Sequence, residues 1–455
     1  MKRLHSKKIL IWIGLLCLVL PSTQFMAVKS TSAPETSQAE FLLQSFSGVK
    51  NVTCFTSPDS SFETTLQYLQ SAKSSIYVEI YSISNGFLTY ELDSAAQRGV
   101  TDIKVLLSSN RASGSETYWS RAAAYNLTQA GIPVRWTSDD FRFTHAKFII
   151  IDGKTTIIQS ANWAKTSIPP DPTRGNREWG VVIHDQEVAN YFNNVFTNDW
   201  IISTEYQLDP EHNVTLSANI DRGKYPHPFN ASTFVEEMTI IPVLSPDTAV
   251  DAILNLIASA NQTLYVQQMY IKMEWDGADD LFLEALIVAT QRGVEVKVIL
   301  DGDSSGMNET AQYLSSAGAQ VRFDNNTYFQ WQHNKGVVVD GKVVLISSIN
   351  WSFESTHKNR EAGVIIHNPN AANYFGEIFA WDWVVSQPFD AGNGPMTVTI
   401  TETTTVATTE IGTVTTTVIL PEIGFNILIV LAIVGIIPLF LARSHAKVRA
   451  QKRKS

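Results

Sequence analysis

The sequence predicts two tandem, repeated α/β sandwich domains, each a mixed β-sheet flanked by helices, that together form one pseudo-twofold site, followed by a C-terminal transmembrane helix. Three observations support this fold class. The middle of the chain is an internal repeat, apolar runs alternate with helical stretches in each copy, and a charge-free apolar segment lies near the C-terminus. The length of 455 residues is enough for two ordinary domains with tethering segments.

The repeat consists of many matches in one order. SAKSSIYVEIYSIS at 71–84 matches SANQTLYVQQMYIK at 259–272, and FTHAKFIIIDGK matches WQHNKGVVVDGK, both at an offset of 188 residues. NREWGVVIH then matches NREAGVIIH at an offset of 183, because the first copy holds the extra loop IPPDPTR. So many matches in the same order indicate a duplicated domain.

Each copy has the pattern of a sheet covered by helices. The runs IKVLL and VKVIL are apolar throughout, which is typical of strands buried on both faces. The Asp-Gly pairs at 152–153 and 340–341 each join two apolar runs and predict a β-hairpin. We expect the copies to occupy residues 43–203 and 238–386, with a proline-containing connector at 204–237.

Both ends of the chain indicate export. Residues 1–27 have the basic start and apolar run of a secretory signal peptide, with an uncleaved anchor as the alternative. Residues 423–442 carry no charge and are long enough to span a bilayer, which places the basic residues 443–455 in the cytoplasm. The Thr-rich residues 391–421 are predicted to form an extended stalk, with an edge strand as the alternative. We therefore expect an ectodomain at the cell surface, unless the end is a processed sorting tail.

Charge and cysteine content narrow the function classes. Ten of the 34 Lys and Arg lie before residue 9 or after residue 442, so about 24 face 44 Asp and Glu in between, a net charge of about −20. The electrostatic field of a protein with this negative charge does not attract polyanions, which argues against indiscriminate DNA binding. Cys17 lies in the predicted signal peptide, which leaves Cys54 alone, and no internal disulfide is expected.

Each predicted hairpin carries the same polar residues at the same spacing. His and Lys begin a strand, Asp occupies the turn, Ser and Asn return on the next strand, and Asn and Glu follow. In the first copy these are His145, Lys147, Asp152, Ser160, Asn162, Asn176 and Glu178, and in the second His333, Lys335, Asp340, Ser348, Asn350, Asn359 and Glu361. Residues two apart on a strand share a face, so these groups converge on one patch, and their placement in an apolar framework indicates function.

A second repeated pair of histidines serves as a contrast. His184 and His367 also recur, but they have no polar companions in register, and we interpret them as structural strand ends. No His, Cys and carboxylate spacing typical of a zinc site is present in the sequence. We therefore expect neither a metal nor a cofactor.

The motif HxKxxxxD, followed by Ser-x-Asn and Asn-Arg-Glu, occurs twice and resembles the phospholipase D superfamily over roughly residues 50–386. Many members have Gly before the Ser, whereas this chain has Gln159 and Ser347. This departure puts substrate preference in doubt more than reaction type.

The resemblance implies a phosphodiesterase with a phosphohistidine intermediate. One neutral imidazole attacks phosphorus, and a protonated one on the other side gives a proton to the leaving alkoxide. It implies His145 as the nucleophile and His333 as the acid, although the similar copies leave the reverse order open. The positive charge that a metal would supply comes from Lys147 and Lys335.

The remaining motif residues are expected to support these groups. Glu178 and Glu361 resemble the family carboxylates that fix the histidine tautomer. Asp152 and Asp340 are expected to brace the motif turns more than to transfer protons. The residues expected to contact the phosphate oxygens and the substrate are Ser160, Asn162, Asn176, Ser348, Asn350 and Asn359.

The substrate is less well defined by the sequence. Surface tethering and acidic charge favour phospholipid headgroups, with three alternatives: a surface single-strand nuclease, a cardiolipin synthase-like phosphatidyltransferase and a non-catalytic protein that binds phosphate ligands. Aromatic residues before each motif would stack on bases, pack against acyl chains or simply fill the core. These are Phe141, Phe143, Tyr328, Phe329 and Trp331. No obligate protein partner is inferred, and the oligomeric state is left open.

Overall fold

The computed structural model describes residues 41–108, 115–170, 174–218, 229–390, 397–405 and 411–419. The predicted signal peptide, transmembrane segment and basic tail lie outside these ranges. Among the ranges that are described, no helix combines the length and the apolar character that crossing a membrane requires.

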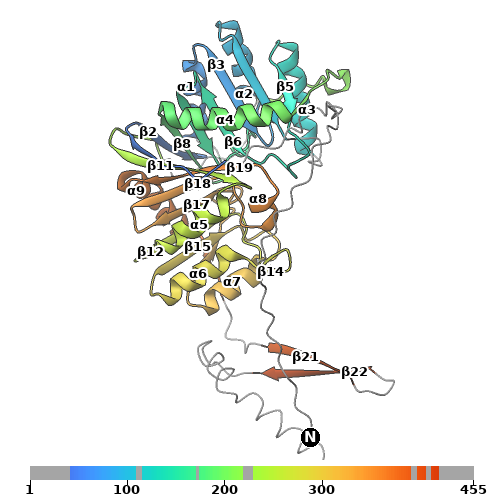
Figure 1. Cartoon of the computed structure of the whole chain (residues 1–455), viewed down its shortest axis with the longest axis vertical. Coiled ribbons are helices and arrows are strands. Elements are labelled where there is room, and N and C mark those ends of the chain that lie inside the picture. The colour runs from blue at the N-terminus through green and yellow to red at the C-terminus, as the bar shows by residue number, and fades with distance from the viewer. Residues whose placement is uncertain are drawn as a thin grey trace, which may run out of the picture. The chain divides into compact units, whose positions relative to one another are not determined.

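Two nine-stranded mixed sheets form the body of the described chain (Figure 1). The first has the order β10 (Ser232–Phe234), β2 (Val52–Ser57), β8 (Glu178–His184), β7 (Thr155–Gln159), β6 (Lys147–Ile151), β3 (Ser75–Ile80), β4 (Asp102–Leu107), β5 (Val134–Trp136) and β9 (Thr204–Glu205). The second has the order β1 (Phe46–Val49), β11 (Met238–Ser245), β19 (Glu361–His367), β18 (Val343–Ser347), β17 (Lys335–Val339), β12 (Thr263–Gln268), β15 (Glu295–Leu300), β16 (Gln320–Phe323) and β20 (Gln387–Pro388). The equivalent strand orders agree with the predicted duplication and with the predicted mixed α/β class.

The two halves exchange edge strands, which the sequence did not reveal. β1 lies at the start of the predicted first repeat but pairs antiparallel with β11 of the second sheet. β10 lies in the predicted connector but pairs with β2 of the first sheet. Each sheet therefore takes one edge strand from a chain segment that adjoins the other half, and the predicted domain boundaries do not coincide with the sheet boundaries.

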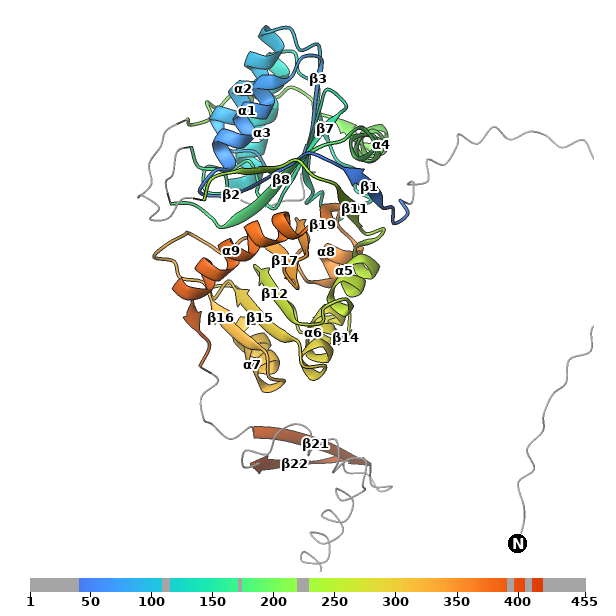
Figure 2. The same ribbon diagram turned by 90° about the vertical axis from the view of Figure 1, so that its left-hand side faces the viewer.

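Helices cover the sheets. α1 (Ser61–Ser71), α2 (Gly86–Gln97) and α3 (Ser115–Gln129) belong to the first half, and α5 (Ala249–Ala258), α6 (Leu281–Gln291) and α7 (Met307–Ser316) belong to the second. α4 (Gln186–Ile202) and α9 (Pro369–Val385) are the long helices that follow β8 and β19 (Figure 2). Their N-terminal N–H groups are capped by the side chains of Asp185 and Asn368. The shorter elements are α8 (Phe353–His357), a 3₁₀ turn η1 (Pro210–His212), β13 (Glu274–Trp275) and β14 (Ala278–Asp279).

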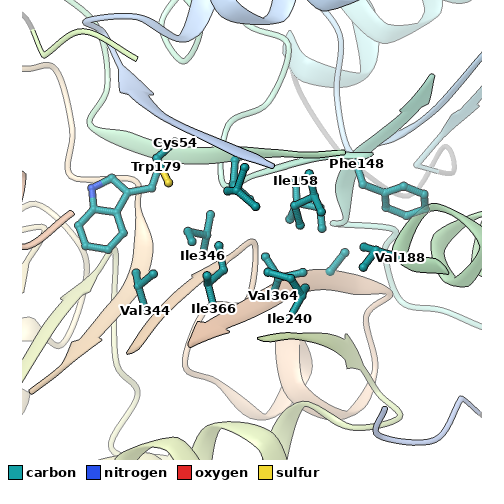
Figure 3. Close-up of a cluster of buried hydrophobic side chains, with 14 of the residues drawn as sticks. Cys54, Phe148, Ile158, Trp179, Val188, Ile240, Val344, Ile346, Val364 and Ile366 are labelled. Carbon is teal, nitrogen blue, oxygen red and sulfur yellow. The ribbon is translucent and has the colours of Figure 1, made fainter. Parts of the chain in front are cut away.

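The inner faces of the two sheets pack against each other in one apolar core (Figure 3). Ile158 and Trp179 of the first sheet lie in the same buried cluster as Ile346 and Val364 of the second. Strand residues alternate between the faces, so the other face of each sheet forms a separate core with its own helices. Burying a side chain of this size contributes about 1.5–3 kcal/mol, which holds the two halves together as one body.

The predicted motif hairpins are present. β6 pairs antiparallel with β7, and β17 with β18. Asp152 and Gly153 both have positive φ angles of 52° and 62°, the conformation of a two-residue type I′ turn. Asp340 and Gly341 repeat this turn with φ angles of 51° and 62°.

The Thr-rich segment differs from the extended stalk that we predicted. β21 (Thr397–Thr405) pairs antiparallel with β22 (Ile411–Ile419), with Thr397 opposite Ile419. These residues are in strands, as in the alternative β interpretation, while a stalk role for residues 391–421 stays a prediction. Alternating β-branched Thr and Val favour a strand, and the segment is long enough to supply its own partner strand.

Candidate active site

The two motif strands begin next to each other at the junction of the halves. The backbone N–H of His145, two residues before β6, donates to the carbonyl of Arg360 over 2.7 Å. The N–H of His333, two residues before β17, donates to the carbonyl of Arg177 over 3.2 Å. Each Arg immediately precedes the motif Glu of its own half, so these bonds set the position of each His against the Glu of the other half.

The histidine–carboxylate pairs cross between the halves. Nδ1 of His145 lies 2.8 Å from Oε2 of Glu361, and Nδ1 of His333 lies 2.7 Å from Oε1 of Glu178. The two carboxylates are buried, and the two imidazoles are mostly buried. Neither half therefore contains a complete site, and Nε2 is the nitrogen of each ring that can react.

Burial shifts the proton equilibria of these pairs. Burial lowers the pKa of His145 to about 4, with the charge of Glu361 opposing the shift and Lys147 and Lys335 adding to it. Burial also lowers the pKa of His333, again with Lys335 and Lys147 adding to the shift. Burial alone would raise the pKa of Glu178, but His333 and Lys335 outweigh it and bring that pKa to about 2. Each lysine thus acts on both histidines, so the two motifs share one electrostatic environment.

The motif lysines are almost fully buried beside the histidines. Lys147 and Lys335 each donate from Nζ to the backbone carbonyl of the His two residues earlier. Burial lowers the pKa of Lys335 to about 8, although Glu178, Glu361 and Asp301 favour its charged form. Two cations held in a protein interior form a binding site for an anion such as a phosphodiester.

These shifts predict a pH profile for kcat/KM, which reports the free chain. A charged Lys335 is needed to hold a phosphate, and its pKa of about 8 predicts a fall in kcat/KM near pH 8. This fall adds to the one at lower pH that is expected if His333 acts as the acid, because burial lowers the pKa of His333. If His145 attacks as the neutral imidazole, its pKa of about 4 places the acidic limb near pH 4. The fall near pH 8 should move to higher pH in Lys335→Arg, because arginine stays charged. An alkaline limb that is the same in the variant would contradict this assignment.

The serines have a different role from the predicted one. The hydroxyls of Ser160 and Ser348 donate to Oε2 of Glu178 and Glu361, each over 2.6 Å. They also accept the N–H of Trp179 and Ala362. The single hydroxyl proton of each serine is thus directed to a carboxylate, so these serines orient Glu178 and Glu361, while their contact with a phosphate oxygen stays a prediction.

The asparagines divide into two pairs. Asn162 and Asn350 are buried, and their Oδ1 atoms have no hydrogen-bond partner. Asn359 donates to Oε1 of Glu361 over 3.1 Å, whereas Asn176 donates to Ser167 over 3.1 Å. The two halves of the site are therefore similar but not identical.

Asp152 and Asp340 lie at the opposite ends of β6 and β17 from the histidines. A five-residue strand is about 16 Å long, which separates them from the reacting groups. Asp152 accepts the backbone N–H groups of Lys73, Ser74 and Ser75, and Asp340 those of the segment 261–263. They brace the turns, so they are not placed to transfer protons.

A network of buried arginines, which was not predicted from the sequence, joins the halves. Arg177 binds Asp382 over 2.9 Å and Asp59 over 2.7 Å. Arg360 binds Asp199 over 2.8 Å and Asp247 over 2.5 Å. In each case one of the two acids lies in the other half, so the contact is reciprocal.

Sequence signals for this network were present. Arg177 and Arg360 are the middle residues of the repeated Asn-Arg-Glu, and Asp199 and Asp382 begin the repeated Asp-Trp. The remaining two acids come from Ser-Pro-Asp, repeated at 57–59 and 245–247.

The aromatic residues before the motifs serve two purposes. Phe141 and Phe329 are buried against the guanidinium groups of Arg360 and Arg177, as the core-packing alternative predicts. Phe143 is half-buried, and Trp331 is 41% exposed, each two residues before a motif His. These two remain available to contact a substrate.

A family model described as "Cardiolipin synthase, PLD-like domain" matches residues 65–200 and 253–383, more than half of the chain. The chain belongs to the phospholipase D superfamily. The two matched stretches contain the two motifs and their Glu residues, so the family pattern and the crossed pairs involve the same side chains.

The relatives that this chain matches are named for different reactions. A cardiolipin synthase of Clostridium perfringens is 26% identical over 259 residues, which cover 52% of this chain and 49% of that protein. A phospholipase D of Rickettsia typhi is 31% identical over 38% of this chain and 80% of its own length. A mitochondrial cardiolipin hydrolase of Mus musculus is 35% identical over 22% of this chain and 44% of its own. The chain thus spans about half the length of several relatives it matches.

Solved structures confirm the fold alone. A phosphatidylserine synthase of Haemophilus influenzae superimposes with a TM-score of 0.55 at 16% identity, over 74% of this chain and 88% of that one. A polyphosphate kinase of Porphyromonas gingivalis superimposes with a TM-score of 0.50 at 14% identity, over 74% and 50%. The superfamily fold is therefore shared by proteins named for different chemistry, and the reaction must be argued from the site.

Proposed function

We propose that this chain is a phospholipase D-type phosphodiesterase that releases headgroups from phospholipids through a phosphohistidine. The observation that carries the proposal is the pair of crossed contacts between His145 and Glu361 and between His333 and Glu178. Each carboxylate holds Nδ1 of its imidazole, which directs Nε2 to the substrate. Two such imidazoles with two buried lysines are the groups that a double displacement at phosphorus needs.

The reaction proceeds in two balanced steps. Nε2 of His145 attacks phosphorus while the bond from phosphorus to the headgroup oxygen breaks, and His333 gives its proton to that oxygen. Water then attacks phosphorus, His333 takes the water proton, and the bond to His145 breaks. The products are phosphatidic acid and the free alcohol. Lys147 and Lys335 stabilise the charge on the non-bridging oxygens in both steps.

The protonation states fit this order. His145, with its pKa of about 4, is neutral at physiological pH and ready to attack. Burial lowers the pKa of His333 in the free chain as well, but a bound phosphate anion raises the pKa of a neighbouring imidazole. With the substrate bound, His333 therefore takes up from the solvent the proton that it then gives to the leaving oxygen. Glu361 stabilises the positive imidazole of the phosphohistidine.

Several features favour a lipid substrate. The curated relatives are named for phospholipids or cardiolipin, and the acidic middle of the chain repels long nucleic acids. The half-buried Phe143 and the exposed Trp331 lie near the two histidines, where acyl chains would meet the protein. Transfer to an alcohol in place of water is the second candidate, favoured by the cardiolipin synthase match over 52% of the chain.

The test uses the full-length chain with phosphatidylcholine vesicles, in the presence of a chelator and with glycerol added in parallel. Choline release with formation of phosphatidic acid is the expected result, and phosphatidylglycerol in the glycerol arm would identify a transferase. An end-labelled single-stranded oligonucleotide forms the third arm. Trimming of the oligonucleotide without choline release would contradict the lipid proposal and identify a nuclease.

We also propose that the catalytic part is exported and held at the cell surface by residues 423–442. The support is the apolar start of the chain, the charge-free run near its end and the basic residues after it. Protease treatment of intact cells is expected to remove the body of the chain and to leave a short C-terminal fragment in the membrane. Full protection of the body would contradict this location.

A further inference from the structure

One of the two buried arginine networks contains an extra acid. Glu79 of β3 and Gln267 of β12 occupy equivalent positions, 188 residues apart, and both are fully buried. Each side chain contacts the Asp that binds the arginine of its network, which is Asp199 for Glu79 and Asp382 for Gln267. The two networks therefore differ by a carboxyl group in one and an amide in the other.

Gln267 shows which hydrogen bonds this position forms. Its Nε2 donates to Oδ2 of Asp382 over 2.6 Å and to Oε1 of Gln332 over 3.1 Å. Its Oε1 accepts a hydrogen bond from Nδ2 of Asn334 over 3.3 Å. The amide thus donates to the neighbouring carboxylate, and it has a donor of its own.

An ionised Glu79 cannot form these bonds. The neighbouring Asp199 accepts from Arg360 with both oxygens, over 2.8 and 3.2 Å, and a carboxylate has no proton to donate. Ala146 stands at the position of Asn334, and no donor of the described chain reaches either oxygen of Glu79. An unpaired carboxylate in a protein interior is strongly unfavourable, so such a group takes up a proton.

The surroundings of Glu79 favour the neutral form. The residues directly across from it on the neighbouring strands are Leu106 and Phe148, which are apolar and buried. Burial and the charge of Asp199 raise the pKa of Glu79 well above its ordinary value, although Arg360 opposes the shift. The other titratable groups along or next to β3 and β4 contact different partners, namely Tyr77 with Asp102 and Lys104, and Tyr81 with His145.

The charges of the two networks also agree with a bound proton. Three carboxyl groups of the described chain surround the guanidinium group of Arg360, whereas two surround that of Arg177. With every acid ionised, the network of Arg360 would have one negative charge more than the network of Arg177. A single proton on Glu79 makes the two networks equal in charge.

We propose that Glu79 is a proton-binding site of the junction between the halves: it stays protonated in the folded chain and donates a hydrogen bond to Asp199, as the amide of Gln267 does to Asp382. The inference goes beyond the proposed function and does not depend on which reaction the chain catalyses.

The proton lies next to the support of one motif histidine. The side chain of Arg360 binds Asp199, and the backbone carbonyl of Arg360 accepts the N–H groups of His145 and Ala146 over 2.7 and 2.9 Å. Loss of the proton would add a negative charge to a buried network that already contains excess acid. The junction is therefore expected to lose stability as the pH rises.

The direction of this effect follows from the proton balance. In the unfolded chain Glu79 loses its proton near the ordinary value of 4.5, whereas the folded chain keeps it to higher pH. The folded state thus binds one proton more above pH 4.5, and stability falls with rising pH until Glu79 also ionises in the folded chain. One proton changes the equilibrium constant of unfolding about tenfold per pH unit.

The experiment follows urea unfolding of the full-length chain from about pH 5 to about pH 8. Glu79→Gln introduces the residue of the second half, and Gln267→Glu introduces that of the first. The unfolding constant of the wild type, divided by that of Glu79→Gln, is expected to rise about tenfold per pH unit. The unfolding constant of Gln267→Glu, divided by that of the wild type, should rise in the same way.

Infrared spectroscopy at neutral pH gives a second readout. The spectrum of the wild type minus that of Glu79→Gln should contain the C=O stretching band of a neutral carboxyl group. A missing band, or a ratio of unfolding constants that is the same at every pH, would show an ionised Glu79 and overturn the proposal. Failure of Glu79→Gln to fold would also overturn it, because the amide would then be no substitute for the protonated acid.

Discussion

Replacing His145 or His333 with alanine is expected to lower choline release from phosphatidylcholine by about 1,000-fold or more, because the two imidazoles act as a unit. In the proposed mechanism, His145 forms the bond to phosphorus, and His333 moves the proton in both steps. Neither histidine can replace the other, because each imidazole is fixed on its own side of the site by a buried Glu of the opposite half. The measurement is kcat/KM for the full-length chain and each variant.

His367→Ala is the matched control for these variants. His367 also has a counterpart in the other copy, His184, but it is exposed at the end of β19. This variant is expected to keep the activity of the wild type within about twofold, as surface substitutions usually change little. Activity above a tenth of the wild-type value in either His145→Ala or His333→Ala would contradict the double-displacement assignment.

Arg360→Leu is expected to lower the free energy of unfolding by about 3–5 kcal/mol, because it removes one partner of a buried ionic network. Asp199 and Asp247 would stay in the interior without their cation. The loss of Arg360 also removes a positive charge near the buried Glu79. Burial and the charge of Asp199 already raise the pKa of Glu79 well above its ordinary value, and Arg360 opposes that shift. Activity should fall as well, because the backbone carbonyl of residue 360 accepts the N–H of His145, and this carbonyl shifts when the buried side chain loses its anchoring acids. Denaturant unfolding measures the change in stability.

Arg142→Ala provides the comparison. Arg142 also contacts the other half, through Glu354 over 3.0 Å, but both side chains are about half exposed. Exposed ion pairs contribute about 0–1 kcal/mol in measured proteins, so this variant should unfold nearly like the wild type. Equal effects of Arg360→Leu and Arg142→Ala would contradict a structural role for the buried network.

The sequence was most informative where local pattern and repetition agreed. The alternation of apolar runs predicted the mixed sheets, and Asp-Gly between two such runs predicted turns that need positive φ angles. The motif residues were found because each recurs at a fixed offset in both copies. Their convergence followed from strand geometry, since His and Lys lie two residues apart at a strand start.

Features that depend on contacts between distant segments were missed. The exchange of β1 and β10 between the sheets cannot be predicted from the local sequence, because the residue pattern of an edge strand does not depend on which sheet it joins. The bond from Ser160 to Glu178 was not predicted, because proximity to the motif does not tell which acceptor the single hydroxyl proton will find. Arg177 and Arg360 were visible in the repeated Asn-Arg-Glu, but a buried Arg is recognised only when its acids are known.

The most direct measurement uses the His333→Ala variant with a phosphatidic acid ester of p-nitrophenol, a leaving group that needs no acid. His145 is expected to attack and to release one equivalent of nitrophenol per chain in a rapid burst. The covalent adduct then accumulates, because His333 is not there to activate water. Mass spectrometry should find the phosphatidyl group on the peptide that contains His145. No burst, or the same burst in His145→Ala, would contradict the phosphohistidine mechanism.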